Sequence, residues 1–340
     1  MLLWKKMHLG EEKTRVEQDI IKWINGKKKF LNIISVPYNS TEIFIEIIQK
    51  YMKEDKKVIY ITDEKPGQIS IISNIKKYTN LKDYSYIKKF TNNNSNLKIC
   101  SLETATKIDQ KFDLIIYDDI SSFSYHNRYE ILDILDKLAY ENSRIISYSI
   151  EEILKNADYI IIPLKNNKFP IVEPRTVITR INISKDIPFV IYDYLKWSIN
   201  AGRKVIIYVP DYIKVREVSS YIRQYCKYIL KNIMCFERER PDEKVISKFF
   251  NMENAVLITD YFGDLISHIE NSDIMIYFAD NKSFNYKEFI YLCASVARDK
   301  KNLKGEVIFL ANYETKEMEK AKCIARNFNK EAWNMGLLKV

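Results

Sequence analysis

The sequence predicts an α/β protein made of two tandem domains, each with a mostly parallel sheet covered by helices. Short apolar runs alternate with stretches of helical spacing over residues 11–150, and the alternation resumes over residues 188–332. Between these regions, four of the eight prolines (Pro163, Pro170, Pro174 and Pro188) fall in a short polar window, which is typical of a domain boundary. A chain of 340 residues is also long for one core and fits two domains.

The first half supplies five predicted strands. They are apolar runs that end in polar or proline-containing turns, at residues 30–36, 57–62, 97–101, 113–117 and 144–148. Helices are expected where apolar residues recur every three or four positions, over residues 11–29, from Thr41 to Tyr51, after the Pro66-Gly67 turn to Tyr78, and over residues 129–140. Strand and helix alternating at this spacing imply parallel strands.

The second half repeats the pattern. Strands are expected at residues 204–209, 232–236, 255–259, 274–278 and 305–310. Helices are expected at residues 188–201, 211–230, 241–251, 285–297 and 314–332. The repetition predicts a second α/β domain of about the same size as the first.

Composition narrows the class of protein. Hydrophobic residues make up 46% and charged residues 29% of the chain, as in globular proteins. No apolar run approaches the ~18 residues of a membrane span, so no transmembrane segment is expected. The five scattered cysteines argue against a disulfide framework or a zinc site and favour a reducing cytoplasm. The net charge of +9 favours an anionic partner, although evenly spread lysines are also typical of a solvated surface.

Two adjacent acids, Asp118 and Asp119, follow the apolar run of residues 113–117. Ligands of open α/β sheets bind beyond the carboxyl ends of the strands, so paired carboxylates there suit a Mg²⁺ site. The alternative is that both acids cap the strand and face water. His126, close behind, has no second histidine at metal-ligand spacing and is more typical of a surface or packing residue.

Glycine is scarce, with seven residues in 340, and no two lie close together. No glycine-rich phosphate loop of the usual kinds can therefore exist. The turn after the first strand reads SVPYNSTEI (residues 35–43), with proline and asparagine where small residues would be expected.

Several further segments, spread over residues 15–335, match the motifs of a known protein family in order and spacing. They are DLIIYDDISSFSY (113–125), RIISYSI (144–150), RKVIIYVP (203–210), VLITDYFGDLIS (256–267), FIYLCASVARD (289–299) and the helix from Thr315 to Trp333. In order and spacing, the chain resembles the superfamily 2 helicases, and more narrowly the ComFA-type competence helicases, the DNA-translocating ATPases of transformable Gram-positive bacteria.

The resemblance implies two tandem RecA-like domains: an ATP-binding-type domain at residues 1–172 and a C-terminal helicase domain at residues 173–340. It makes Ser40, Thr41 and Asp118 the vestigial nucleotide-binding positions. Thr41 and Asp118 become the Mg²⁺ ligands, and Asp119 and Arg298 the catalytic positions. It implies ATP and Mg²⁺ as cofactors, single-stranded DNA and competence proteins as partners, and a place in the cytoplasm or at the inner face of the membrane.

The departures from the family fall on its chemistry. Ser40 stands at the phosphate-binding lysine, Asp119 is one methylene shorter than the water-activating glutamate, and Ser295 and Asp264 replace arginines. Pro37 removes a backbone donor from the loop. Thr41 could instead cap the following helix, and Arg298 is favourable at a helix end in any case.

We therefore predict a degenerate helicase that binds single-stranded DNA or an active partner with little ATP hydrolysis. Three alternatives stay open. One is a working NTPase that borrows a lysine from residues 27–29, and another is a structural interaction protein. The third, a sugar-nucleotide transferase, shares the architecture but fits the order of segments poorly.

Overall fold

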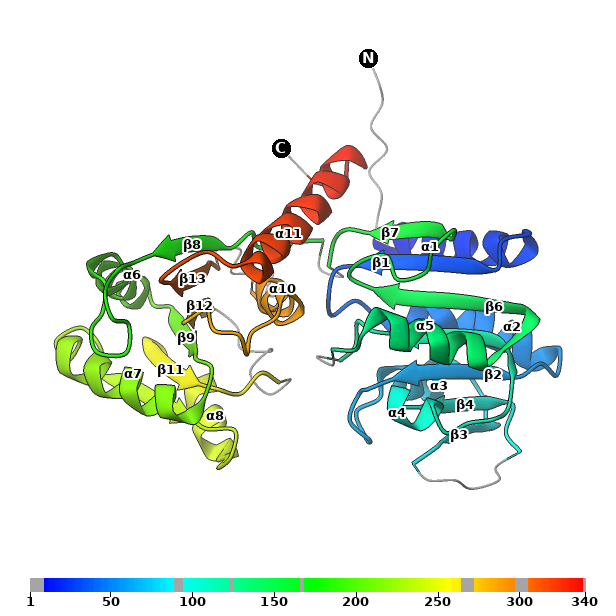
Figure 1. Cartoon of the computed structure of the whole chain (residues 1–340), viewed down its shortest axis with the longest axis horizontal. Coiled ribbons are helices and arrows are strands. Elements are labelled where there is room, and N and C mark those ends of the chain that lie inside the picture. Colours follow the sequence, from blue (N-terminus) through cyan, green and yellow to red (C-terminus); the bar gives the residue numbers. More distant parts are fainter. Residues whose placement is uncertain are drawn as a thin grey trace, which may run out of the picture. The chain divides into compact units, whose positions relative to one another are not determined.

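The computed structural model describes residues 9–88, 94–122, 125–165, 168–263, 272–296 and 305–338. The chain divides into two compact units (Figure 1). The first comprises Met1–Lys168 together with Glu331–Val340, and the second comprises Phe169–Lys330. Each unit is built around one parallel sheet, as the sequence predicts.

The first unit holds a seven-stranded sheet in the order β3-β4-β2-β5-β6-β1-β7, with every neighbouring pair parallel. The strands are β1 (Phe30–Ser35), β2 (Val58–Thr62), β3 (Tyr84–Tyr86), β4 (Leu97–Cys100), β5 (Phe112–Asp118), β6 (Ala139–Ser149) and β7 (Asp158–Ile162). Every residue of β2 is buried. Strands covered on both faces read as continuous apolar runs, which is why the sequence shows these segments so clearly.

Helices cover both faces of this sheet. They are α1 (Leu9–Asn25), the 3₁₀ turn η1 (Thr41–Phe44), α2 (Ile45–Lys53), α3 (Ser70–Tyr78), α4 (Leu102–Ala105) and α5 (Arg128–Lys137). Figure 1 shows α4 and α5 on the near face and α1 and α2 on the far face. A buried cluster joins α4 and α5 to the sheet through residues such as Leu102, Ile115 and Leu135.

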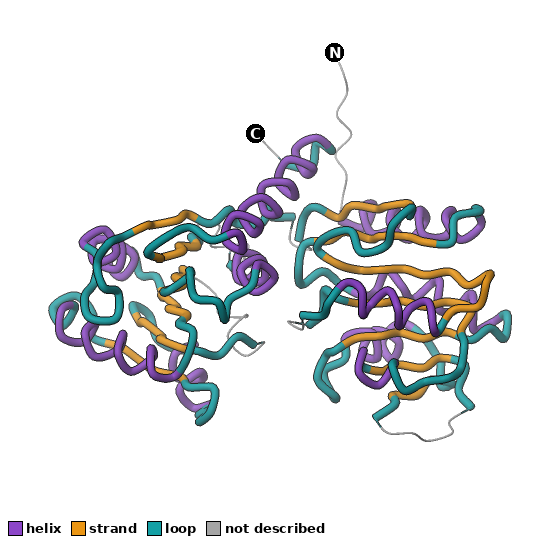
Figure 2. Tube along the Cα trace, viewed as in Figure 1, coloured by secondary structure: helices purple, strands orange, loops and turns teal. Residues whose placement is uncertain are grey.

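The second unit holds a six-stranded sheet in the order β10-β11-β9-β12-β13-β8, again parallel throughout. Its strands are β8 (Arg175–Ile178), β9 (Lys204–Tyr208), β10 (Asn232–Phe236), β11 (Ala255–Thr259), β12 (Ser272–Tyr277) and β13 (Val307–Ala311). Its helices are α6 (Phe189–Asn200), α7 (Tyr212–Tyr225), α8 (Glu243–Phe250), α10 (Tyr286–Ser295) and α11 (Lys316–Asn334), of which the residues from Glu331 onward belong to the first unit. Figure 2 shows the same alternation of helix and strand along the trace.

One buried cluster of the second unit lies between the sheet and helices α6 and α7. Both helices contribute buried aliphatic residues, such as Leu195 and Val218. Polar caps fix where the helices begin: the Asp211 side chain accepts from the Lys214 amide, and Asn285 and Glu288 form a capping box at α10. The described fold thus follows local signals that are present in the sequence.

Candidate functional site

The turn that follows β1 is closed by its own side chains. Asn39 donates from Nδ2 to Ser35 Oγ and to the Leu164 carbonyl, both at 2.9 Å. Tyr38 takes a left-handed backbone conformation with φ of 68°. A phosphate-binding loop needs backbone N–H groups that point into an open concavity. Here a buried asparagine amide ties the turn to the end of β1 and to the residue two positions beyond β7.

Ser40 and Thr41 both have protein partners. The Ser40 hydroxyl accepts from the Glu42 amide at 3.1 Å and caps η1. Thr41 is fully buried, and its Oγ1 accepts from Asn74 Nδ2 at 3.0 Å. The idea that Thr41 caps the following helix is therefore wrong, because Ser40 holds that position.

Asp118 is buried at the carboxyl end of β5, with 1% of its surface exposed. Tyr60 donates its hydroxyl to Oδ2 at 2.6 Å, and the amides of Ile120 and Ser121 donate to Oδ1. Burial raises the pKa of this carboxyl, and the bonds from Tyr60 and Ser121 oppose that rise. Asp118 is thus satisfied by the protein and does not face water.

The Tyr60 ring, whose hydroxyl bonds to this carboxylate, packs within a group of buried aromatic side chains. The Phe44 ring packs edge-on against Tyr60 at 6.0 Å and against Tyr148 at 5.3 Å between centroids, and all three side chains are fully buried. Phe44 belongs to the same 3₁₀ turn as Thr41. Phe44 and Tyr60 therefore connect that turn to Asp118.

The two adjacent acids lie on different faces of the sheet. Successive residues of a strand point to opposite faces. Asp119 accepts at Oδ1 from the Tyr117 hydroxyl at 3.1 Å, whereas Asp118 bonds to Tyr60 on the other side. The structure thus brings Asp118 and Asp119 to the same edge but separates their carboxylates, an arrangement unlike two ligands of one ion.

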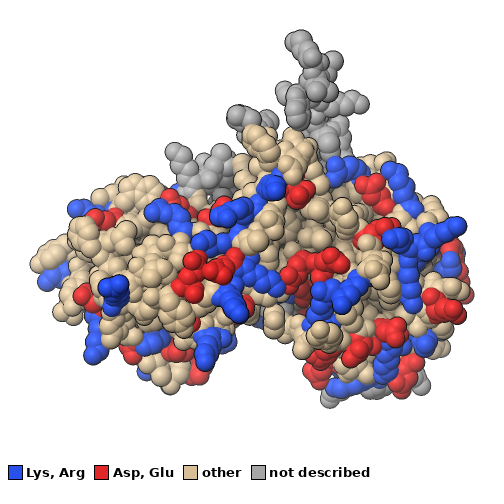
Figure 3. All heavy atoms as spheres, turned by 45° about the horizontal axis from the view of Figure 1, so that its top comes forward, with Lys and Arg blue, Asp and Glu red and all other residues tan. Residues whose placement is uncertain are grey.

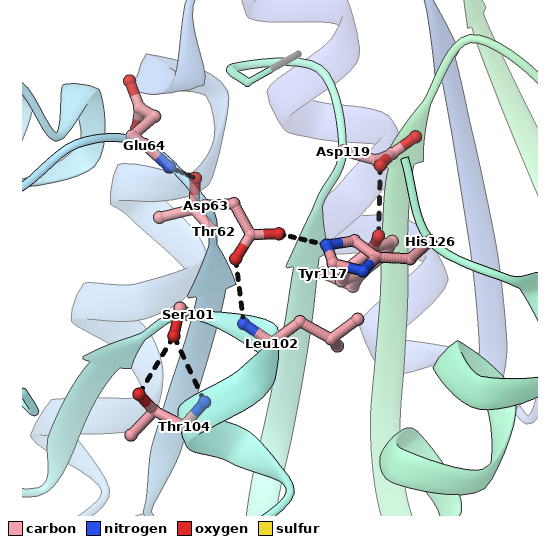
Figure 4. Close-up of polar contacts among 9 residues, drawn as sticks. All are labelled: Thr62, Asp63, Glu64, Ser101, Leu102, Thr104, Tyr117, Asp119 and His126. Carbon is pink, nitrogen blue, oxygen red and sulfur yellow. Dashed lines mark hydrogen bonds and ion pairs between the residues drawn. The ribbon is translucent and has the colours of Figure 1, made fainter. Parts of the chain in front are cut away.

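A second polar cluster, which the sequence analysis missed, lies beside Asp119 (Figure 4). The His126 Nε2 and Asp63 Oδ2 atoms are 2.5 Å apart, and the other oxygen of Asp63 accepts from the Leu102 amide at 3.1 Å. Asp63 therefore joins the segments that follow β2, β4 and β5. One signal could have found it: like Asp118, it directly follows an apolar strand.

The predicted positions of the second unit are only partly described. Ser295, at the end of α10, donates its hydroxyl to the Leu292 carbonyl at 2.8 Å. Arg298 and Asp264 lie outside the described residues. Among the described residues, no three His, Cys, Asp or Glu side chains are grouped so that they could hold a metal ion.

Figure 3 shows Lys and Arg interspersed with Asp and Glu over the visible face. Within the described residues, no helix is both long enough and apolar enough to cross a bilayer.

Two solved structures match nearly the whole chain. Dbp5 of S. cerevisiae, bound to RNA and ADP BeF3, aligns over 95% of this chain and 91% of its own with a TM-score of 0.51 and 10% identity. The DEAD-box helicase Mss116, bound to ssRNA and UDP-BeF, aligns over 95% of this chain and 84% of its own with a TM-score of 0.54 and 13% identity.

The fold is that of a helicase core. Its two sheets correspond to the tandem RecA-like domains of DEAD-box helicases, as the resemblance to superfamily 2 implies. No protein-family model matches the sequence, and no curated protein matches it either. The likeness therefore rests on structure at low sequence identity.

Proposed function

We propose that this chain is a helicase-fold protein that has lost ATP turnover and binds single-stranded DNA, alone or with an active partner. The observation that carries the first part is the buried Asp118 carboxylate, which is bonded to Tyr60, whose ring packs edge-on against Phe44. A carboxylate that holds Mg²⁺, directly or through water, needs free lone pairs and access. Asp118 is buried and both of its oxygens already accept hydrogen bonds from the protein, so the residues present do not fit Mg²⁺ and ATP.

The turn at residues 37–40 supports the same proposal. Nucleotide binding there would require the Asn39 amide to leave Ser35 and the Leu164 carbonyl, because it closes the turn. No cation stands where a phosphate-binding lysine would be, since Ser40 caps η1. Loss of the lysine and of the stabilising arginines removes most of the charge that phosphoryl transfer needs.

A rearranged site that borrows Lys27, Lys28 or Lys29 is a weaker explanation. These residues precede β1, whereas the turn at residues 37–40 follows it. Six residues of strand separate the two ends by about 20 Å. The Lys28 ammonium also lies 3.6 Å from the carboxylate of Asp158, the first residue of β7.

The single-stranded DNA partner follows from the resemblance to ComFA-type helicases and from the helicase fold. On this proposal, residues 1–172 and 173–340 keep the two-domain scaffold, and the process is DNA uptake during competence. The protein would act in the cytoplasm, at or near the inner face of the membrane, together with other competence proteins. Contacts to phosphates make such binding weaken steeply as salt rises.

The test is ATP hydrolysis by the full chain, with and without single-stranded DNA, beside the Asp118→Ala variant. We expect no turnover above that of the variant, and no thermal stabilisation by Mg²⁺ and ATP. If the wild type hydrolyses ATP at ordinary helicase rates and Asp118→Ala abolishes this activity, the proposal that ATP turnover has been lost is wrong. Strand binding is measured separately, so the two parts of the proposal can fail independently.

A further inference from the structure

The amino edge of the second sheet is where three consecutive helices end. Helix α6 ends at Asn200 before β9, α7 at Tyr225 before β10, and α8 at Phe250 before β11. These three strands are neighbours and parallel, in the order β10-β11-β9, so their starts lie side by side. The connections at residues 201–203, 226–231 and 251–254 therefore form one continuous surface, called here the amino-edge surface.

Large aromatic side chains are exposed on the amino-edge surface. Scattered single hydrophobic residues are normal on a protein surface, but here four occur in three adjacent connections or the helix turns that lead into them. They are Trp197, Tyr225, Tyr228 and Phe250, at 52%, 44%, 84% and 37% exposure. The Lys227 ammonium lies over the Tyr228 ring at 4.8 Å from its centroid, so the least covered ring already carries a cation.

The same surface carries an excess of positive charge. Residues 218–236 include Arg223, Lys227 and Lys231 but no aspartate or glutamate. The exposed side chains of Lys196 and Lys248 add to them from α6 and α8.

The amino-edge surface has few acidic residues, and one of those near it is already paired. Glu253 is the acid in the three connections, and Asp273 at the start of β12 is buried against Arg203. Within the described part of the chain, Lys227 and Lys231 form no ion pair, so the surface offers cations beside aromatic rings.

The carboxyl edge of this sheet carries acids as well as cations such as Arg238 and Arg240. Acids follow β9, β10, β11 and β12 there, at Asp211, Glu237, Asp260 and Asp280. The guanidinium of Arg216 is paired with Glu237 at 3.2 Å. The cationic surface thus lies at the sheet edge opposite to the one where ligands of parallel α/β sheets usually bind.

We propose that the amino-edge surface binds single-stranded nucleic acid, with its lysines on the phosphates and Tyr225 and Tyr228 stacked on bases. This inference rests on the nucleic-acid partner of the proposed function and places it on specific side chains. Exposed aromatic rings among cations are the pattern of sequence-tolerant strand binding. A membrane surface would require a broad aliphatic face, whereas Ile229 and Leu230 of the same connection point inward and are partly or fully covered.

The test uses the full chain and a fluorescent single strand of mixed sequence, with dissociation constants measured over a series of salt concentrations. The test variant is Lys227→Glu with Lys231→Glu. Its control is Arg238→Glu with Arg240→Glu, which makes the same charge change at the carboxyl edge. All four side chains are exposed, so both variants should melt like the wild type.

We expect the Lys227/Lys231 variant to bind at least about tenfold more weakly and to lose about 1.4 from the slope of log K against log salt. Tyr228→Ala should weaken binding roughly fivefold or more through loss of stacking. The control variant should stay within about twofold of the wild type. A strand that carries iodouracil should cross-link on irradiation to the peptide that contains Tyr225 and Tyr228.

Two results would overturn the inference, and they differ in what they say of the proposed function. If the control variant loses binding while the Lys227/Lys231 variant keeps it, the surface is wrong but strand binding stands. If the wild type binds no strand, and instead binds phosphatidylglycerol vesicles through Lys227 and Lys231, both proposals are wrong.

Discussion

The Tyr60 hydroxyl donates to the Asp118 carboxylate at 2.6 Å across two neighbouring strands, and neither side chain reaches solvent. The residue most easily taken for a metal ligand is therefore part of the protein's own hydrogen-bond network. Its role in this fold is to fix the end of β5 and the turn after it, through bonds to the Ile120 and Ser121 amides.

Tyr60→Phe should destabilise the first unit by about 1–3 kcal/mol, because it leaves a buried carboxylate without its hydroxyl donor. Urea denaturation followed by circular dichroism measures the loss. Tyr225→Phe, at an exposed ring, is the control and should leave the midpoint unchanged. Equal midpoints for both variants would show that the bond contributes nothing to stability.

Asp118→Asn should change how stability depends on pH. Burial raises the pKa of Asp118 above its ordinary value of 3.8. The folded state therefore binds the proton more tightly than the unfolded state, and the contribution to stability is fully present below 3.8 and lost as pH rises through the raised pKa. The stability of the wild type relative to Asp118→Asn should thus increase as pH falls from about 7 to about 4, in denaturation curves taken across that range. A difference that does not vary with pH would contradict the prediction.

Arg203→Met should be far more damaging than Arg216→Met. Arg203 donates from Nε and Nη2 to the buried Asp273 at 2.8 and 2.6 Å. Its loss leaves the Asp273 carboxylate buried without its cationic partner. We expect a loss of about 3–5 kcal/mol. The Arg216 side chain is 59% exposed in its pair with Glu237, and its replacement should cost less than about 1 kcal/mol. Guanidinium denaturation of both variants gives the comparison, and similar losses would contradict it.

Asp63→Ala should be more disruptive than His126→Ala, although the two side chains share a bond. Asp63 also accepts from the Leu102 amide, and that second bond survives the loss of His126. Hydrogen exchange at the Leu102 amide should therefore accelerate in Asp63→Ala and stay near the wild-type rate in His126→Ala. Acceleration in both variants would mean that His126 is required to hold Asp63 in place.

Most of the strands that the sequence predicts are buried on both faces, and the partly buried edge strand β10 is the exception. The runs at residues 57–62 and 255–259, for example, form β2 and β11 with every described residue buried. The first helix is found at Leu9–Asn25, slightly earlier than expected, and the helix expected at residues 41–51 begins as a 3₁₀ turn. Local apolar periodicity is enough for such elements.

Three strands were not predicted, because pairing rather than local pattern creates them. β3 has three residues, and β7 and β8 are only partly buried edge strands. β8 lies within the proline-rich window and pairs with β13, far along the chain. β6 also begins at Ala139, earlier than expected, where a helix end was predicted.

The sequence predicts where the candidate site lies but not which side chains bond to or pack around its carboxylate. A sequence places Asp118 at the edge of a sheet, yet it cannot show that Tyr60, 58 residues earlier, donates to it. It also cannot show that Phe44 packs edge-on against the Tyr60 ring. These contacts depend on which strands are neighbours, and the order β2-β5-β6 is a property of the whole sheet.

The neighbours of the earliest strand in each unit bear on how the protein can fold during synthesis on the ribosome. In the first unit, β1 is hydrogen-bonded between β6 and β7, and in the second unit β8 pairs with β13. The earliest strand of each unit therefore has no partner until nearly all of that unit has been synthesised. In the first unit that strand, β1, is mostly apolar, so a nascent chain exposes it until β6 has been made, and a chaperone would protect the chain most during that period.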